Sequence, residues 1–356
     1  MRLSTAGGHR PGRMWSARAT RRLRTLAAVF AGLAPLLIVT GCDPLTAHSG
    51  TEQITVAAVP GIENANLYLA EHDGYFAKAG VSVRIERYSS VAKEITALSQ
   101  GSVDVIAADY GDVFYDETVQ PNPIYKLLAD GYDAAPGVIE IVTMPNSPIK
   151  NPADLAGQRI PVPNLEVSPT PAGAPDTLAL SSAVSVLQSD GVNLAAVQWE
   201  SMPQSQEITE LTKGQVPAIL VSGLGVYDAQ QQGAVELIDA CSGPTSGIPL
   251  DGFFASAGWL SQAKNLAAAK AFREGLYNAD AAATMPGPIQ AVLPAWIGSS
   301  MTKQEAGLVT TGTYPLSTIV ANVQRTAILM DSEGMTASEV NVADMLRFGP
   351  TSTHSG

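Results

Sequence analysis

The sequence predicts an α/β protein of two lobes, in which each lobe is a mostly parallel sheet flanked by helices and two crossing strands form a hinge. Three observations lead to this fold class. Residues 54–109 alternate between apolar strands and amphipathic helices, an order typical of parallel sheets with right-handed crossovers. A helix, glycine and strand pattern at 94–106 occurs again at 207–219. A late apolar segment, 252–256, is placed to return the chain from the second lobe to the first.

The repeated stretch is thirteen residues long and opens on a glutamate in both copies. Glu94 to Ile106 reads E-I-T-A-L-S-Q-G-S-V-D-V-I, and Glu207 to Ile219 reads E-I-T-E-L-T-K-G-Q-V-P-A-I, with seven identities. Each copy predicts the end of an amphipathic helix, a glycine stop and a short strand. One interpretation is that any helix–glycine–strand unit has this appearance. The other is two similar lobes whose loops face one cleft, because open α/β sheets bind ligands at the carboxyl ends of their strands.

Residues 1–41 have the features of an export signal and not of a folded domain. They contain seven arginines and no acidic residue, and an apolar run extends from Leu26 to Val39. This run is short for a membrane span and is interrupted by proline and glycine. It ends in V-T-G-C, which resembles a bacterial lipobox, so Cys42 is the predicted site of lipid attachment and residues 42–51 are a tether. The alternatives are an uncleaved anchor with a chance Gly-Cys and, for the route, twin-arginine export at Arg21-Arg22.

The body begins at Ile54, and its elements follow one another at short intervals. Pro60-Gly61 ends the first strand, glycines end the first helices, and Asn151-Pro152 begins a later one. The predicted strands are 54–59, 81–88, 103–107, 125–129, 138–143, 159–162, 196–199, 218–221, 235–239 and 252–256. The predicted helices are two that start near Asn64 and Ser90, one through Val113 and Phe114, and 176–188, 202–213, 261–283, 288–297, 303–309, 317–330 and 340–346.

These elements predict how the chain is divided into domains. The first lobe is expected from 52–143 plus 250–348, with a second lobe at 144–249 inserted into it. The tail at 349–356 is expected to be disordered. Two strands that cross between the lobes form a hinge, an arrangement that lets two lobes close on a ligand.

Three stretches of the body resemble a known family. They are Tyr68 to Val81 (Y-L-A, then G-Y-F-A-K-A-G-V), Leu98 to Val105 (L-S-Q-G-S-V-D-V) and Ile149 to Ile160 (I-K-N-P-A-D-L-A-G-Q-R-I). Over roughly 54 to 345 the chain resembles the nitrate/sulfonate/taurine-type substrate-binding lipoproteins of ABC importers, a superfamily that includes binders and synthases of the thiamine pyrimidine precursor. The resemblance implies a periplasmic-binding-protein-like fold of type II. The chain departs from the family at Ser222 to Gly225, which is small and uncharged where many relatives carry charge or tryptophan.

The two-lobe prediction nominates three loops in each lobe that follow strands and precede helices, where free N–H groups favour oxygen acceptors. The predicted ligand-binding residues are Asn64, Tyr68, Ser89, Ser90, Asp109, Tyr110, Ser168, Thr170, Ser201, Ser222, Gly223 and Phe253. Each has a structural alternative. Asn64, Ser90, Ser201 and Asp109 can simply cap helices, and the aromatic rings can pack in the core instead of stacking on a planar ligand.

None of the nominated loops contains lysine or arginine. Since oxyanion sites often recruit arginine, the sequence favours a neutral or cationic heterocycle as ligand, with a sulfonate or nitrate left open. After residue 41 the chain has 14 lysines and arginines (21 − 7) against 33 acids, which argues against nucleic acid as a partner. The expected partners are ABC permease subunits and, through the lipid anchor, the outer face of the cell membrane. The expected state is a monomer.

The sequence also argues against catalysis, and it predicts no cofactor and no metal. His72 is the only one of four histidines in the body, and Cys241 is the only cysteine there. No G-x-S-x-G motif and no third glycine after Gly223-x-Gly225 accompany them, so nucleophilic, zinc and dinucleotide sites lack residues. We expect an exported solute-binding component of an importer. The alternatives are a pyrimidine-precursor-synthase-like enzyme on the same fold and a surface lipoprotein that senses a ligand or binds a partner.

Overall fold

The computed structural model describes residues 52–120, 124–165, 174–175, 177–298 and 301–348. Contacts group Gly50–Gly356 into one compact unit. The predicted export signal, Cys42, the tether and the tail lie outside the described residues, as do Ser168 and Thr170. Among the described residues, no helix combines the length and the apolar character that a membrane span requires.

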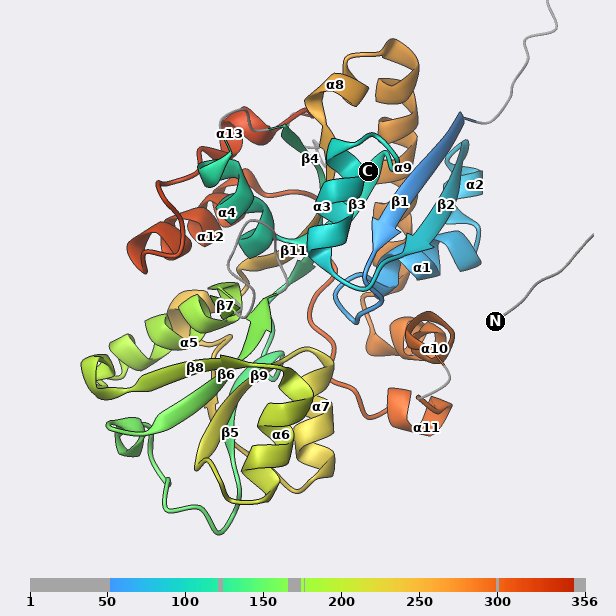
Figure 1. Cartoon of the computed structure of the whole chain (residues 1–356). Coiled ribbons are helices and arrows are strands. Elements are labelled where there is room, and N and C mark those ends of the chain that lie inside the picture. Colours follow the sequence, from blue (N-terminus) through green and yellow to red (C-terminus); the bar gives the residue numbers. More distant parts are fainter. Residues whose placement is uncertain (1–51, 121–123, 166–173, 176, 299–300, 349–356) are drawn as a thin grey trace, which may run out of the picture. The chain divides into compact units, whose positions relative to one another are not determined.

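The described elements alternate between strands and helices over the first half of the body (Figure 1). The strands are β1 (Glu52–Ala58), β2 (Val81–Arg87), β3 (Val105–Asp109), β4 (Tyr125–Asp133), β5 (Ile139–Thr143), β6 (Arg159–Leu165), β7 (Ala174–Pro175), β8 (Gln198–Met202), β9 (Ala218–Ser222), β10 (Val235–Asp239) and β11 (Pro249–Ser256). The helices are α1 (Ala65–His72), α2 (Tyr75–Lys78), α3 (Val91–Ser99), α4 (Tyr110–Val119), α5 (Thr177–Ser189), α6 (Gln204–Thr212), α7 (Leu224–Gln231), α8 (Ala257–Leu260), α9 (Ala263–Ala282), α10 (Pro286–Ile297), α11 (Lys303–Ala306), α12 (Val320–Ser332) and α13 (Val342–Met345), with short 3-10 turns at 152–155, 194–196 and 243–245.

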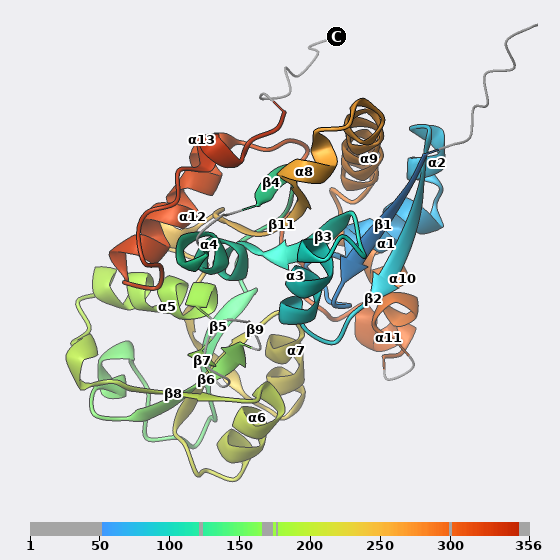
Figure 2. The same ribbon diagram turned by 45° about the horizontal axis from the view of Figure 1, so that its top comes forward.

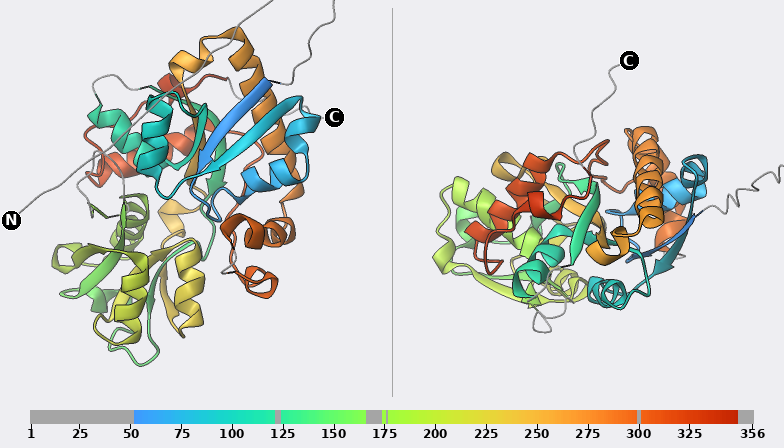
Figure 3. Two further views of the ribbon diagram at one scale, coloured as in Figure 1. Left: turned by 45° about the vertical axis from the view of Figure 1, so that its right-hand side comes forward. Right: turned by 90° about the horizontal axis from the view of Figure 1, so that it is seen from above.

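A five-stranded sheet has the order β2-β1-β3-β11-β4. β1 pairs parallel with β2 and β3, as the alternation predicts, whereas β11 pairs antiparallel with β3 and β4. The direction of β11 follows from the path of the chain, because this strand returns from the second group of strands and enters the sheet from the opposite end. Helices α1, α2 and α9 cover one face of the sheet, and α3 and α4 contact the other (Figure 3).

The second group of strands lies between residues 139 and 239 (Figure 2). β5 pairs antiparallel with β9 and β10, and β6 pairs parallel with β8. The predicted boundary placed 138–143 in the first lobe, but this strand joins β9 and β10 instead, and only β6 and β8 are parallel here. All five residues of β5, including Glu140 and Thr143, are buried, so the strand has no exposed face whose pattern would show which sheet it joins.

The chain passes between the two groups of strands along neighbouring segments. The backbone N–H of Ala134, just after β4, donates to the carbonyl of Ile248, just before β11, at 2.8 Å. A third segment, which the sequence did not predict, joins them. Asp133 and Thr313 exchange two backbone hydrogen bonds, of 2.8 and 3.1 Å. The crossing therefore has three segments side by side.

The two copies of the repeat form the same structure, so the predicted helix, glycine stop and strand are confirmed. Gly101 and Gly214 follow the last turns of α3 and α6, and their φ angles are +69° and +67°. Gly101 N–H donates to the carbonyl of Leu98 and the next residue donates to Ala97; the equivalent bonds follow Gly214. This is the Schellman pattern, in which a left-handed glycine lets the last carbonyls of a helix find partners.

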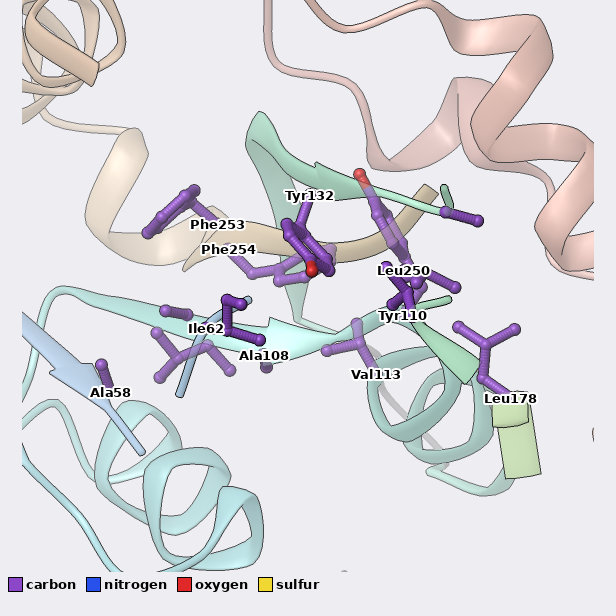
Figure 4. Packing of buried hydrophobic residues seen from close by; sticks show 14 of the residues in the cluster. Ala58, Ile62, Ala108, Tyr110, Val113, Tyr132, Leu178, Leu250, Phe253 and Phe254 are labelled. Carbon is purple, nitrogen blue, oxygen red and sulfur yellow. The ribbon is translucent and has the colours of Figure 1, made fainter. Parts of the chain in front are cut away.

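The buried side chains form a continuous core that reaches into both groups of strands (Figure 4). Leu250, Phe253 and Phe254 come from β11, Tyr132 from β4 and Leu178 from the first turn of α5. A second, smaller apolar cluster lies on the other face of β5 and β9 and includes Val142 and Ile219. Both strands are therefore buried on both faces, and β9 (A-I-L-V-S) is apolar up to its last residue.

Candidate functional site

A cavity of about 320 Å³ lies where the ends of β1, β3 and β11 meet β5, β9 and the start of α5. This volume is at the lower end of the range for small-molecule pockets, about 300–1,000 Å³. The cavity therefore suits a small ligand. The lining residues are Val59, Pro60, Gly61, Glu63, Asn64, Val91, Ala107, Asp109, Tyr132, Val138, Ile139, Leu178, Ala179, Gln204, Ser222, Gly223, Leu224, Leu250 and Asp251.

Both copies of the repeat contribute to this cavity in the same way. Asp109 ends the strand of the first copy, and Ser222 ends the strand of the second. Val91 and Gln204 are the first residues of the two repeat helices, and they also line the cavity. The loops after the two repeated strands thus face one cavity, as the sequence predicted.

Four of the predicted ligand-binding residues line the cavity: Asn64, Asp109, Ser222 and Gly223. Asn64 is the residue before α1, but its side chain makes no capping hydrogen bond to this helix. Its side chain donates to the Val59 carbonyl at 2.8 Å and accepts from Trp296 at 3.0 Å, so it fixes the shape of the loop after β1. Asp109 does cap α4, because its carboxylate accepts from the N–H of Gly111.

Four other nominated polar or aromatic residues do not line the cavity. Tyr68 stacks on Trp296, with ring centroids 5.4 Å apart. Ser89 is exposed and accepts from the ammonium of Lys93 at 2.6 Å, and Ser90 precedes α3 without a side-chain capping bond. Ser201 lies within β8, not after it. Their predicted contact with ligand stays a prediction.

Tyr110 and Phe253 lie in the core. Tyr110 is fully buried under the sheet and its hydroxyl donates to Asp130 at 3.1 Å. Phe253 is equally buried and packs edge-on against Phe272, with centroids 5.6 Å apart. Tyr110 is the first residue of α4 and Phe253 lies in the middle of β11, and neither residue lines the cavity. The packing alternative that the sequence left open describes them.

Sequence reasoning missed Asp251, which lines the cavity from β11. Asp251 is opposite Asp109 of β3 on one side and opposite Tyr132 of β4 on the other. It is 6% exposed. Burial, and then the negative charges of Asp109 and Glu63, raise the pKa of Asp251 well above its ordinary value. An acid inside the apolar run P-L-D-G-F-F was the sequence signal that could have identified it.

Glu63 reaches across the cavity from the loop after β1. A Cβ placed on Gly61, in the same loop, would overlap one carboxylate oxygen of Glu63, and a Cβ on Gly223 would overlap the other. Gly223 begins the turn into α7 and has a φ of +53°. Glycine at both positions therefore makes room for the carboxylate of Glu63.

The described part of the lining contains three carboxylates and no lysine, arginine or histidine. Across the described residues, no group of three or more histidine, cysteine or acidic side chains is arranged to hold a metal ion. The site combines apolar side chains with three carboxylates, an arrangement that can bind and orient a small molecule.

A family model described as NMT1/THI5-like matches residues 62–279, more than half of the chain. The chain belongs to the NMT1/THI5-like family. The family resemblance predicted from the three sequence stretches is thereby confirmed. The comparison with curated proteins found no match.

Solved structures share the fold of this NMT1/THI5-like protein. The periplasmic aliphatic sulphonate binding protein SsuA from Escherichia coli is 16% identical, with a TM-score of 0.64 over 83% of this chain and 97% of that one. The desulfurization enzyme DszB gives 14% and 0.62 over 83% and 96%. The periplasmic nitrate-binding protein NrtA from Synechocystis PCC 6803 gives 13% and 0.58 over 83% and 85%. The predicted two-lobed α/β fold is thereby confirmed.

Proposed function

We propose that this protein is the extracytoplasmic solute-binding component of an ABC importer, which captures a small molecule and delivers it to a membrane permease. The observation that carries the proposal is the cavity between the ends of β1, β3 and β11 and the ends of β5 and β9. Its walls come from two groups of strands joined by crossing segments. Such an arrangement closes on a ligand by a hinge motion.

The proposal is supported by the names of its structural relatives and by the start of the sequence. Two of the similar structures are named as periplasmic binding proteins, for aliphatic sulphonates and for nitrate. The basic and apolar segment before V-T-G-C, with Cys42 as the lipid-attachment residue, fits an exported lipoprotein held at the outer face of the membrane. We propose that the protein acts there as a monomer.

An enzyme on the same fold is the alternative, since DszB is named a desulfurization enzyme. The positions of Cys241 and His72 argue for a binding protein and against such an enzyme. Cys241, the only cysteine among them, is 1% exposed, and burial first raises the pKa of its thiol to about 12. A buried neutral thiol is a poor nucleophile. His72 lies at the end of α1, pairs with Asp73 at 2.7 Å and does not line the cavity.

The first test is identification of the bound molecule. Small molecules released by denaturing the purified mature protein are analysed by mass spectrometry, and each is then titrated calorimetrically into stripped protein. Ser222→Tyr should abolish binding, because the ring fills the cavity, whereas Ser205→Tyr on the exposed side of α6 should not. Cells that lack the protein should also lose uptake of that molecule. A stripped protein that binds no small molecule, or equal binding by both tyrosine variants, would refute the proposal.

A further inference from the structure

Strand pairing brings together two of the three carboxylates of the cavity, Asp109 and Asp251, which are far apart in the chain. Asp109, Asp251 and Tyr132 occupy facing positions on the adjacent strands β3, β11 and β4. Side chains that face each other across strands are about 4.5–5.5 Å apart at Cβ, and like charges there are destabilising. The protein therefore holds two acids next to each other at an energetic cost.

One carboxylate oxygen of Asp251, Oδ1, is buried and has no hydrogen-bond partner among the described residues. The side chain lines the cavity and is more than nine-tenths buried. A buried polar atom without a partner is costly, and native proteins usually satisfy it. A ligand atom in the cavity is placed to do so.

The helix N-termini around the cavity would by themselves favour an anion. In this protein, side-chain carboxylates lie at these N-termini in place of an anionic ligand. Asp109 accepts the N–H of Gly111 at the start of α4, and the carboxylate of Glu63 lies against Gly223 at the start of α7. These carboxylates compensate the positive ends of the two helices. The described lining contains no lysine or arginine that would provide another positive charge for an anion.

We propose that the ligand is a small organic cation, an alkylammonium or amidinium compound, whose charged group pairs with Asp251 between Asp109 and Glu63. This inference rests on the proposed solute-binding function and specifies its ligand class. The apolar part of the ligand contacts the apolar lining, which includes Ile139, Leu178 and Leu224. Charge-assisted hydrogen bonds to a carboxylate are about twice as strong as neutral ones, so the cationic group determines specificity.

Glu63 gives the cation a contact on both sides of the cavity. It belongs to the loop after β1, and its carboxylate extends to the turn between β9 and α7. A cation bound beside Glu63 therefore lies next to segments from both groups of strands.

The charges around Asp251 predict that binding releases protons. The titratable groups that face it are Glu63, Asp109, Glu94, Asp130, Tyr132 and Tyr314. All are acids or phenols, so nothing among them stabilises the charged form of Asp251. A bound cation does, and the carboxyl group loses its proton on binding. Affinity for the cation should therefore rise with pH.

The test is calorimetric titration of stripped protein with a panel of primary amines, amidines and guanidines, their neutral isosteres, taurine and nitrate, in buffers of different ionisation enthalpy. We expect a cation to bind at least tenfold more tightly than its isostere, with proton release. Asp251→Asn should lower that affinity roughly 10- to 100-fold and abolish proton release. The matched control is Asp280→Asn, an equally buried acid outside the lining, which should change affinity less than twofold.

The outcomes separate this inference from the proposed function. Tight binding of taurine, nitrate or a neutral heterocycle, with cations bound no better, would refute the cation while leaving solute binding intact. Equal loss of affinity in Asp251→Asn and Asp280→Asn would also refute it. Melting temperatures of both variants show whether either change has unfolded the protein. Glu63→Gln then provides a second variant, exposed enough to tolerate substitution, that should weaken cation binding as well.

Discussion

Gly223 shows how a single residue determines the geometry of the site. Its φ of +53° with a ψ of −125° is a backbone conformation that residues with a Cβ rarely adopt. A Cβ there would also overlap Glu63. The sequence marked Ser222 to Gly225 as unusually small, and the structure gives the reason, because the space belongs to the carboxylate of another loop.

We predict that Gly223→Ala lowers the free energy of unfolding by about 1–3 kcal/mol, the range for a strained backbone, and weakens ligand binding. Urea denaturation and calorimetry measure the two effects. Gly191→Ala is the control, since its φ is +75° but its Cβ would meet nothing within 4 Å; it should lose less stability and no affinity. Glu63→Ala in the Gly223→Ala background should recover part of the lost stability, and no recovery would contradict the overlap.

At the scale of elements, the repeat places the same chemistry at two positions. Glu94 and Glu207 are both the fourth residue of their helix and both are 0% exposed. Burial, and then the charge of Asp251, raise the pKa of Glu94 well above its ordinary value. The glutamate shared by the two copies is therefore a buried residue outside the cavity lining, whereas the helix starts, Val91 and Gln204, line the cavity.

We predict that Gly101→Ala and Gly214→Ala each destabilise the protein by about 1–2 kcal/mol, the cost of a left-handed conformation for a residue with a Cβ. The two costs should be equal, because both glycines have nearly the same φ and a Cβ on either meets nothing within 4 Å. Thermal unfolding measures them. Gly258→Ala in α8, where φ is not positive and space is open, should be neutral or slightly stabilising. Costs that differ by more than about 1 kcal/mol would show that the copies are not equivalent.

At the scale of the whole body, the folded chain buries many acids and few bases. Burial is the first cause that raises the pKa of Asp133, Glu117 and Glu140 to about 7. It also raises the pKa of Asp130 and Asp280 well above the ordinary value. These acids are protonated in the folded protein at a pH at which they are ionised in the unfolded chain, so folding binds protons.

We predict that the protein is more stable at pH 5 than at pH 8. The stabilisation from a raised pKa is complete below the unfolded value, near 4, and is lost as the pH rises through about 7. Melting temperatures across this range measure the slope. Glu140→Gln should flatten it, because the amide keeps the shape without the charge, and the exposed Glu52→Gln should not. A melting temperature that rises towards pH 8 would contradict the prediction.

Much of the fold could be predicted because the repeat, the alternating strands and helices and the glycine stops are local signals. They fixed the order of elements and the parallel pairing of β1 with β2 and β3. Local signals also placed Asn64, Asp109, Ser222 and Gly223 at strand ends, and all four line the cavity. The helix α7 was missed because its start, Ser222 to Gly225, has the composition of a loop.

The sequence by itself therefore determined the α/β class, the repeated unit and the family, since these depend on neighbours along the chain. Only the tertiary structure decided that β5 joins β9 and β10, and that Asp251 lies beside Asp109. Both depend on the register between strands that are far apart in the chain. Register follows from the packing of whole faces, and a buried strand with apolar residues on both faces has no pattern that reveals it.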